Sequence, residues 1–447
     1  MGKRWRKVLP LAAVLLAMNS SIAVASADQS ELIKRGEYLA IAGDCGACHS
    51  DEGKAAFSGG HPIVSPLGTI YSTNITPSLS AGIGNYTEQQ FADALRKGVR
   101  GDGSQLYPAM PYTAYATLTD EDVSALYAYF MHGVKAVDTH PQATALPFPF
   151  NLRFSMAAWN LLFLNEKPFT PDSAHSAEWN RGAYLVNGLA HCSTCHTPRN
   201  FLMAEKQDQA LSGASLGTWY APNITPDSQH GIGNWSRQML AEYLMTGHTS
   251  NGATAGGPML EAIDKSFSRM TPEDINAMAA YLLPDDKQHG TAPSPEGLTP
   301  VRGDDTPQAL SKLSRGESIY RNNCASCHNL AGAGLNGLPA LAGNPVLDKP
   351  NADNVAMAVL DGVWPEHRQG MIGFRHELND SQIADVTNYL MSDIAHRNVQ
   401  ISAERVAELR QGGATSPLLL MARGGMIAGA VVVVILLMWL LWRRRHQ

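Results

Sequence analysis

The sequence predicts a mostly α-helical protein in which three tandem domains precede a single membrane-spanning helix. Three observations support this prediction. A five-residue cysteine motif occurs three times, at intervals of 147 and 132 residues; a chain of 447 residues is long enough for about three domains; and nineteen uncharged, mainly apolar residues lie near the C-terminus. The expected segments are a signal peptide (1–27), domain one (28–140), an aromatic and proline-rich linker (141–178), domain two (179–286), a second linker (287–312), domain three (313–398), a stalk (399–423) and the membrane helix (424–442).

The repeated motif is Cys-x-x-Cys-His, and it accounts for every cysteine in the chain. Its members are Cys45, Cys48 and His49, then Cys192, Cys195 and His196, then Cys324, Cys327 and His328. The pattern is the c-type haem attachment signature, because two thiols three positions apart can form thioethers with one haem and the next imidazole can ligate its iron. Zinc sites or redox cysteine pairs are the alternatives, but a histidine follows all three pairs. The sequence therefore predicts three covalently bound haem c groups and leaves no cysteine for a disulfide.

The N-terminus is typical of a secretory signal peptide. Four basic residues among the first seven precede eleven apolar residues from Val8 to Met18, and Ala25-Ser26-Ala27 fits a small-x-small cleavage site. Cleavage there makes Asp28 the first mature residue. A retained anchor is the alternative, but eleven residues are well short of the roughly 20 that span a bilayer.

The C-terminal apolar run, 424–442, is followed by three consecutive arginines. Its nineteen residues would make about 28 Å of helix, against a hydrocarbon core of about 30 Å. A buried soluble helix is the alternative, but such helices carry a polar face. The arginines are expected on the cytoplasmic side, so the haem domains would lie on the periplasmic side of the inner membrane. The net charge of −6 and the pI of about 6.2 give no indication of nucleic-acid binding.

A glycine-containing helix precedes each cysteine motif. The segments are Arg35-Gly36-Glu37-Tyr38-Leu39, Arg181-Gly182-Ala183-Tyr184-Leu185 and Arg315-Gly316-Glu317. Glycine inside a helix costs about 0.5–1 kcal/mol relative to alanine. We therefore expect another helix to approach closely at each of these glycines.

The first two domains share further segments. YSTNITP at 71–77 returns as YAPNITP at 220–226, and GIGNY at 82–86 returns as GIGNW at 231–235. Each pair leads into an expected helix, over 87–97 and 236–246, that ends at a glycine. We interpret the NITP loop as part of the wall around the haem. Each domain is then expected to close with a capped helix, starting at Thr119, Thr271 and Asn379.

A sixth iron ligand would separate electron transfer from catalysis, because a methionine there raises the potential and closes the iron to small molecules. Met110, Met259 and Met371 lie 61, 63 and 43 residues after the histidines of their motifs. Met110 and Met259 also keep the 149-residue offset that relates the two NITP loops. Met270 is the main alternative to Met259. His367 and His376 flank Met371 and leave bis-histidine ligation open at the third site.

Large apolar side chains crowd together in the segment from Pro147 to Phe169. Among them are Phe148, Phe150, Phe154, Trp159, Leu161, Leu162 and Phe163. Packing between domains one and two is one interpretation, and a docking surface for a partner or quinone is the other.

A glycine-containing first helix, the cysteine motif, loops and a closing helix resemble the layout of a class I cytochrome c domain. The chain from about residue 30 to 442 resembles the tri-haem cytochrome c subunits of membrane-bound periplasmic dehydrogenases. That family includes the subunits of gluconate 2-dehydrogenase, sorbitol and fructose dehydrogenases, with flavin partners, and of quinoprotein alcohol dehydrogenase, with a PQQ partner. One departure is that Ile372, where proline is common, follows Met371.

The resemblance implies an electron-transfer subunit and membrane anchor with no catalytic residues of its own. A large flavin- or PQQ-dependent subunit, with or without a small third subunit, would oxidise an alcohol, polyol or sugar acid, gluconate being favoured, and the electrons would reach ubiquinone. No G-x-G-x-x-G motif follows an expected strand, and no catalytic triad arises from the sequence. The rival functions are a donor to a terminal oxidase and a haem enzyme such as a peroxidase, in which one iron would lack a methionine.

Overall fold

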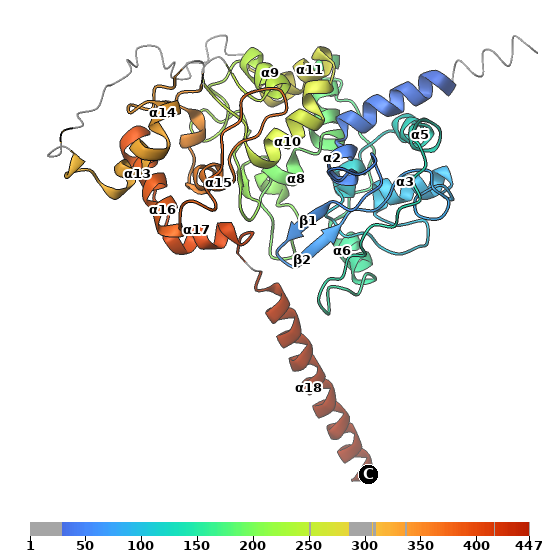
Figure 1. The fold of residues 1–447 in the computed structure, drawn as a ribbon. Coiled ribbons are helices and arrows are strands. Elements are labelled where there is room, and N and C mark those ends of the chain that lie inside the picture. Colours follow the sequence, from blue (N-terminus) through green and yellow to red (C-terminus); the bar gives the residue numbers. More distant parts are fainter. Residues whose placement is uncertain are drawn as a thin grey trace, which may run out of the picture.

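The computed structural model describes residues 29–249, 252–285, 306, 310–335, 338–414 and 416–446. The predicted signal peptide and most of the predicted linker over 287–312 lie outside the described residues. The body is helical with two small β-hairpins, and one long helix projects from it (Figure 1). We call residues 29–140 unit one, 177–285 unit two and 310–411 unit three.

Unit one begins with a helix over residues 29–42 and contains one hairpin, whose strands pair from Pro62 with Tyr71 to Ser65 with Gly68. Its elements are α2 (Cys45–His49), β1 (Pro62–Ser65), β2 (Gly68–Tyr71), α3 (Glu88–Lys97), α4 (Tyr112–Tyr115) and α5 (Asp120–Ala128), which continues as a π-helical turn over Tyr129–Gly133. Between units one and two lies α6 (Ser155–Phe163).

Unit two repeats this order with a shorter hairpin. Its elements are α7 (Ala177–Tyr184) with a π-helical turn over Leu185–Leu189, α8 (Ser193–His196), β3 (Ala214–Ser215), β4 (Tyr220–Ala221), α9 (Arg237–Thr246), α10 (Gly257–Lys265) and α11 (Pro272–Leu282). Unit three contains α13 (Arg315–Asn323), α14 (Ala325–His328), α15 (Asp353–Asp361), α16 (Asp380–Tyr389) with a π-helical turn over Leu390–Ile394, and α17 (Ala403–Arg410).

The helix boundaries follow local signals in the sequence. The side chains of Thr119, Thr271 and Asn379 each accept a hydrogen bond from a backbone N–H in the first turn of α5, α11 and α16. Gly98 and Gly247 end α3 and α9 with positive φ angles of 64° and 72°. These predicted starts and stops are confirmed.

The predicted helix crossings are also confirmed. A Cβ atom added to Gly36 would lie 1.9 Å from the carbonyl oxygen of Ala125 in α5. At Gly182 it would lie 1.9 Å from the oxygen of Ala277 in α11, and at Gly316 2.2 Å from the oxygen of Asp385 in α16. Because the backbones touch at these points, each first helix packs directly on the closing helix of its unit.

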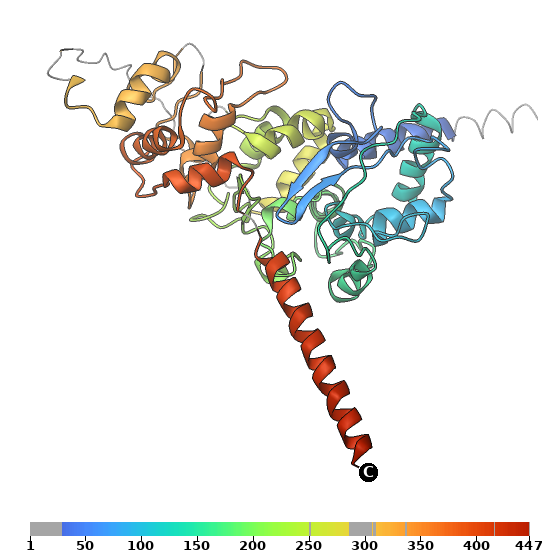
Figure 2. The same cartoon turned by 60° about the horizontal axis from the view of Figure 1, so that its bottom comes forward.

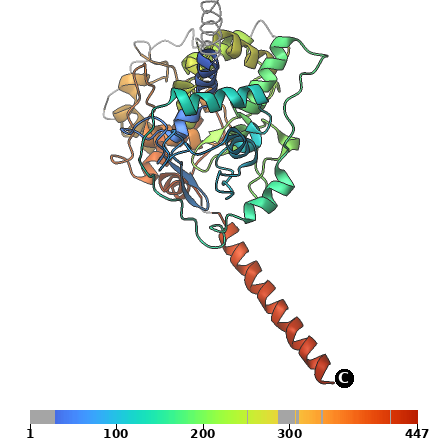
Figure 3. The same ribbon diagram turned by 90° about the vertical axis from the view of Figure 1, so that its right-hand side faces the viewer.

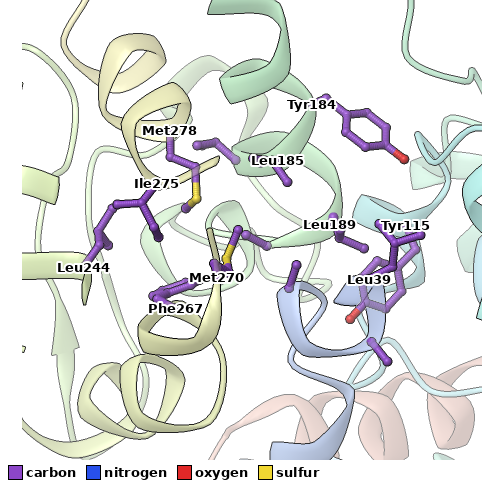
Figure 4. Packing of buried hydrophobic residues seen from close by; sticks show 14 of the residues in the cluster. Leu39, Tyr115, Tyr184, Leu185, Leu189, Leu244, Phe267, Met270, Ile275 and Met278 are labelled. Atoms are coloured by element: carbon purple, nitrogen blue, oxygen red, sulfur yellow. The ribbon is translucent and has the colours of Figure 1, made fainter. Parts of the chain in front are cut away.

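Units one and two share one hydrophobic core, whereas unit three has its own. The shared core joins Leu39 and Tyr115 of unit one to Leu189, Met270 and other residues of unit two (Figure 4). The second core lies among α13, α15, α16 and α17. The distinction is clear in Figure 2, where unit three lies to one side of the other two.

The segment predicted as a stalk, 399–423, is not an extended connection. Residues Ala403–Arg410 form α17, which buries Val406 and Leu409 in the core of unit three. Arg405 and Arg410 also form ion pairs with Asp353 and Asp380, at 2.8 and 2.6 Å. The polar composition that suggested a stalk belongs to the outer face of an amphipathic helix.

The last helix, α18, spans Leu418–Arg445 and has a mean hydropathy of 2.6 over its most apolar window. Its length and composition suffice to cross a bilayer. It includes the predicted run of 424–442 and is longer at both ends, because the helix continues through the flanking residues (Figures 1 and 3).

Candidate haem-binding sites

The cysteines of the three motifs lie at or next to the short helices α2, α8 and α14, and all six are free thiols. Burial raises the pKa of the Cys45 and Cys192 thiols to about 12. Such thiols are protonated at neutral pH. In the part of the chain that the structure describes, no three His, Cys, Asp or Glu residues are grouped so as to hold a metal ion. The cysteines therefore suit thioether formation better than direct metal binding.

The imidazoles of the first two motifs are fixed by backbone carbonyls. His49 Nδ1 lies 2.7 Å from the Thr73 oxygen, and His196 Nδ1 lies 2.6 Å from the Pro222 oxygen. A carbonyl can only accept, so each Nδ1 carries the proton and each Nε2 retains its lone pair. Burial lowers the pKa of both imidazoles, although these hydrogen bonds oppose the shift. Both side chains are thus neutral and oriented as ligands of an iron would be.

Thr73 and Pro222 directly precede the two NITP sequences, and their role could not be read from the sequence. In each loop the asparagine side chain accepts hydrogen bonds from the threonine two residues later, Asn74 from Thr76 and Asn223 from Thr225. The asparagine thus shapes a turn that presents the preceding carbonyl to the histidine. In the sequence, only the repetition of the YxxNITP pattern indicated that these loops contribute to the site.

Unit three differs at this point, since it lacks the NITP sequence. The Pro339 carbonyl approaches His328 and opposes the lowering of its pKa by burial. The geometry falls short of a hydrogen bond, however, and the buried Nδ1 of His328 has no partner among the residues that the structure describes. The third imidazole is therefore less firmly oriented than the other two.

The second and third motifs open into one cavity of about 570 Å³ between units two and three. The lining includes every predicted iron ligand and attachment cysteine of these two units: Cys192, Cys195, His196 and Met259, and Cys324, Cys327, His328 and Met371. Most of the other lining residues are apolar, as a cofactor pocket requires.

The cavity also separates the predicted methionines from their alternatives. Met259 lines it at the start of α10, whereas Met270 is buried in the shared core. Met371 lines it from a β-bridge with Val363, whereas His367 and His376 are exposed. The geometry thus places Met259 and Met371, rather than the alternatives, in the lining of the cavity that His196 and His328 also line.

Met110 belongs to unit one and lies in the turn before α4. Both Met110 and Cys45 pack against the shared core. Val99 and Gln105 form a β-bridge five residues before Met110, and His248 and Thr254 form one five residues before Met259. The local structures around the first two methionines therefore correspond, as their common offset predicts.

Two buried titratable residues directly precede the first two motifs and also line the cavity. Burial raises the pKa of Asp44 to about 8, and the Glu261 carboxylate adds to this. Burial lowers the pKa of His191 to about 4. Both side chains are therefore largely uncharged at neutral pH.

The chain is similar in sequence to known cytochrome c proteins. The model of the cytochrome c family matches residues 33–133 and 313–393. The chain is 44% identical over 413 residues to the fructose dehydrogenase cytochrome subunit of Gluconobacter japonicus, covering 87% of this chain and 85% of that protein. It is 39% identical over 414 residues to the gluconate 2-dehydrogenase cytochrome c subunit of Pantoea cypripedii, covering 88% and 92%. It is also 37% identical over 436 residues to the cytochrome c subunit of alcohol dehydrogenase (quinone) from Gluconobacter oxydans, covering 93% and 89%.

Proposed function

The chain belongs to the family of dehydrogenase cytochrome c subunits, and we propose that it carries electrons from a partner dehydrogenase to ubiquinone by way of three covalently bound haems. The observation that carries this proposal is the cavity between units two and three, because it is lined by two complete sets of the residues predicted to bind haem. Electron transfer requires the haems to lie close together, as two haems in one cavity would. An electron-transfer subunit needs no separate substrate pocket.

The proposed attachment cysteines are Cys45 and Cys48, Cys192 and Cys195, and Cys324 and Cys327. The proposed iron ligands are His49 with Met110, His196 with Met259, and His328 with Met371. The lowered pKa of the His49 and His196 imidazoles supports the first two pairs, and the position of Met259 and Met371 in the cavity lining supports the second and third. Bound in this way, the haem would supply one-electron chemistry, and a thioether ligand would raise its potential and exclude small molecules from the iron.

Three tandem cytochrome c domains, rather than the two regions that the family model matches, are part of the proposal. The middle region supports a third domain, because unit two repeats the cysteine motif, the NITP turn and the helix crossing of unit one. Haem quantification of the intact protein tests the number. Three haem masses per chain are expected, and two would overturn the assignment of one motif.

The partner is proposed to be a large flavin- or PQQ-dependent dehydrogenase subunit, with or without a small third subunit. The family resemblance favours a gluconate 2-dehydrogenase partner, while the fructose dehydrogenase cytochrome subunit has the higher identity to this chain, 44% against 39%. Both support a sugar or sugar-acid substrate. We place the haem domains in the periplasm and the arginine-rich end of α18 in the cytoplasm.

Co-purification through this chain in mild detergent tests the partner. The expected result is a dehydrogenase subunit with a flavin or PQQ, and substrate-dependent reduction of a ubiquinone analogue by the complex. Capture of a haem–copper oxidase instead would favour the donor role.

The ligands are tested by Met259→Ala and Met371→Ala, with Met270→Leu as a matched control in the core. Each alanine variant is expected to change the spectrum and potential of one haem and to allow carbon monoxide to bind the reduced protein. Carbon monoxide binding to the unaltered protein would favour a haem enzyme, and an unchanged spectrum would overturn the ligand assignment.

A further inference from the structure

Helix α6, between units one and two, presents an apolar face to solvent and a polar side chain to the protein. Phe154, which directly precedes the helix, Leu161 and Leu162 are 73%, 87% and 67% exposed. Asn160, by contrast, faces inward: its side chain accepts a hydrogen bond from the Tyr112 hydroxyl at 2.8 Å and donates one to the Lys97 carbonyl at 3.0 Å. A helix on a water-facing surface normally has the reverse arrangement.

The orientation of α6 is fixed by several contacts on its inner side. Trp159 donates a hydrogen bond from its indole nitrogen to the Leu202 carbonyl at 3.0 Å, and its ring lies against Tyr112 with 6.4 Å between centroids. Just before the helix, Arg153 lies over the Tyr107 ring at 4.4 Å. The inner side of this aromatic segment therefore packs on both units, and its outer apolar side chains are held outward by the same contacts.

The apolar face lies next to the membrane helix. Arg423, the residue before the uncharged run of α18, donates a hydrogen bond to the Phe148 carbonyl at 3.1 Å, and Phe148 is 50% exposed. In three views, α6 lies at the end of the body from which α18 projects (Figures 1, 2 and 3). Since Arg423 marks the level at which α18 would leave the hydrocarbon, Phe148 and α6 lie near the membrane surface.

We propose that the outer face of α6, with Phe148, enters the outer leaflet of the bilayer beside α18. This inference rests on the proposed insertion of α18 and goes beyond it, because α6 would be a second, interfacial contact. The helix contains no charged residue, and exposed Phe and Leu side chains are typical of the apolar face of interfacial helices, which enter the membrane by about 5–10 Å. Lipid is the favoured occupant because the face is continuous with the base of α18. Two contacts would fix the tilt of the haem body over the membrane, which a single helix would leave free to swing.

The test uses the full-length holoprotein in vesicles of phosphatidylethanolamine and phosphatidylglycerol that contain a lipid with a photoreactive acyl chain. Cross-linked residues are mapped by mass spectrometry. Labelling is expected in α6 and in α18. The double variant Leu161→Glu, Leu162→Glu is expected to lose the labelling of α6 and keep that of α18. Leu79→Glu, at a leucine that is 70% exposed in the loop before α3, is the matched control and should change neither.

The outcomes separate this inference from the anchor itself. Labelling of α18 without α6 would overturn the interfacial contact and leave the anchor standing, whereas labelling of neither would overturn both. Loss of the co-purifying dehydrogenase in the double variant, without lipid labelling of α6 in the unaltered protein, would identify the face as a protein interface instead. Haem absorbance checks that the variants fold. The double variant Leu161→Ala, Leu162→Ala is a milder substitution, and it too is expected to lower the lipid labelling of α6.

Discussion

Tyr38 and Tyr184 occupy the same place in units one and two, two residues after the glycine at which the helices cross, and unit three has Ser318 there. Tyr38 donates a hydrogen bond to Asp274 of unit two at 2.6 Å, and Tyr184 donates one to Asp122 of unit one. The two units are thus joined by a reciprocal pair of contacts, which unit three cannot make.

The arginines of the same helices complete this arrangement within each unit. Arg35 donates two hydrogen bonds to Asp122, at 3.0 and 2.6 Å, and Arg181 donates two to Asp274, both at 2.7 Å. Each buried carboxylate is therefore satisfied by an arginine of its own unit and a tyrosine of the other. A repeated sequence with self-complementary contacts has produced a pseudo-symmetric pair with one core.

The boundary of unit three with unit two combines polar contacts with the apolar packing of Val363 and Trp219. The Asn354 amide accepts a hydrogen bond from the Tyr220 N–H at 2.7 Å and donates one to the Tyr220 carbonyl at 2.9 Å. Asn344 donates to the Gly252 carbonyl at 2.8 Å, and Arg368 donates to the Thr246 carbonyl at 2.9 Å. This difference predicts that a destabilising substitution in unit one or unit two affects both of them, whereas one in unit three affects unit three alone.

The largest expected effect comes from adding a side chain at a glycine where two helices cross. Gly182→Ala should destabilise the pair by about 3 kcal/mol, because the new methyl group meets backbone atoms that cannot move aside. Haem content should fall at both of the first two motifs, whereas Gly316→Ala should affect the third alone. Peptide mapping of the haem-bearing segments measures this. Gly424→Ala is the control, because a Cβ atom added there would meet no described atom within 4 Å outside the backbone of its own helix. Loss confined to the second motif would contradict the shared core.

Removing the reciprocal tyrosine hydroxyls should have the next largest effect. Tyr38→Phe and Tyr184→Phe each delete a hydrogen bond to a buried carboxylate, worth about 1.5–3 kcal/mol. Both should lower the melting temperature of the pair. Tyr320→Phe, which deletes a bond to the Asn329 carbonyl within unit three, should leave the pair unchanged. Calorimetry with resolved transitions for the pair and for unit three would show the distinction, and a common shift in all variants would refute it.

A smaller effect is the acid sensitivity of the pair. Burial raises the pKa of Asp274, but hydrogen bonds from Arg181 and Tyr38 outweigh it and hold the pKa below its usual value. The carboxylate therefore stabilises the folded state above the unfolded pKa of about 4, and this contribution is lost as the pH falls through the lower folded value. Asp274→Asn should be less stable at neutral pH and should lose less on acidification. If the melting temperatures of the variant and the parent fall by the same amount between about pH 6 and 3, the prediction is contradicted.

The smallest effect is expected at the attachment of unit three. Asn354→Ala removes both hydrogen bonds to Tyr220, at a cost of about 1 kcal/mol, and should increase hydrogen exchange in β4 and α15 without loss of haem. Asn379→Ala, which removes a helix cap within unit three, should increase exchange in α16 but not in β4. Exchange in β4 that is the same in both variants would argue against the polar attachment.

Several features required the folded chain. The carbonyls of Thr73 and Pro222 and the inverted face of α6 depend on segments that are distant in sequence, such as Asn160 meeting Lys97. The stalk prediction failed for the same reason, since Val406 and Leu409 become apolar anchors only when α15 and α16 lie beneath them. The periodicity of an eight-residue helix is too short to reveal that without its partner.

The sequence by itself determined the positions of the cysteine motifs, the caps of α5, α11 and α16, and the glycines of the helix crossings. These depend on chemistry within a few residues, or on a backbone approach that only glycine permits. The tertiary structure alone decided which units form a pair, which two motifs open into one cavity and which face of α6 remains uncovered. Those outcomes depend on contacts between residues more than 40 positions apart, such as Trp159 with Leu202 and Tyr184 with Asp122, which no local pattern encodes.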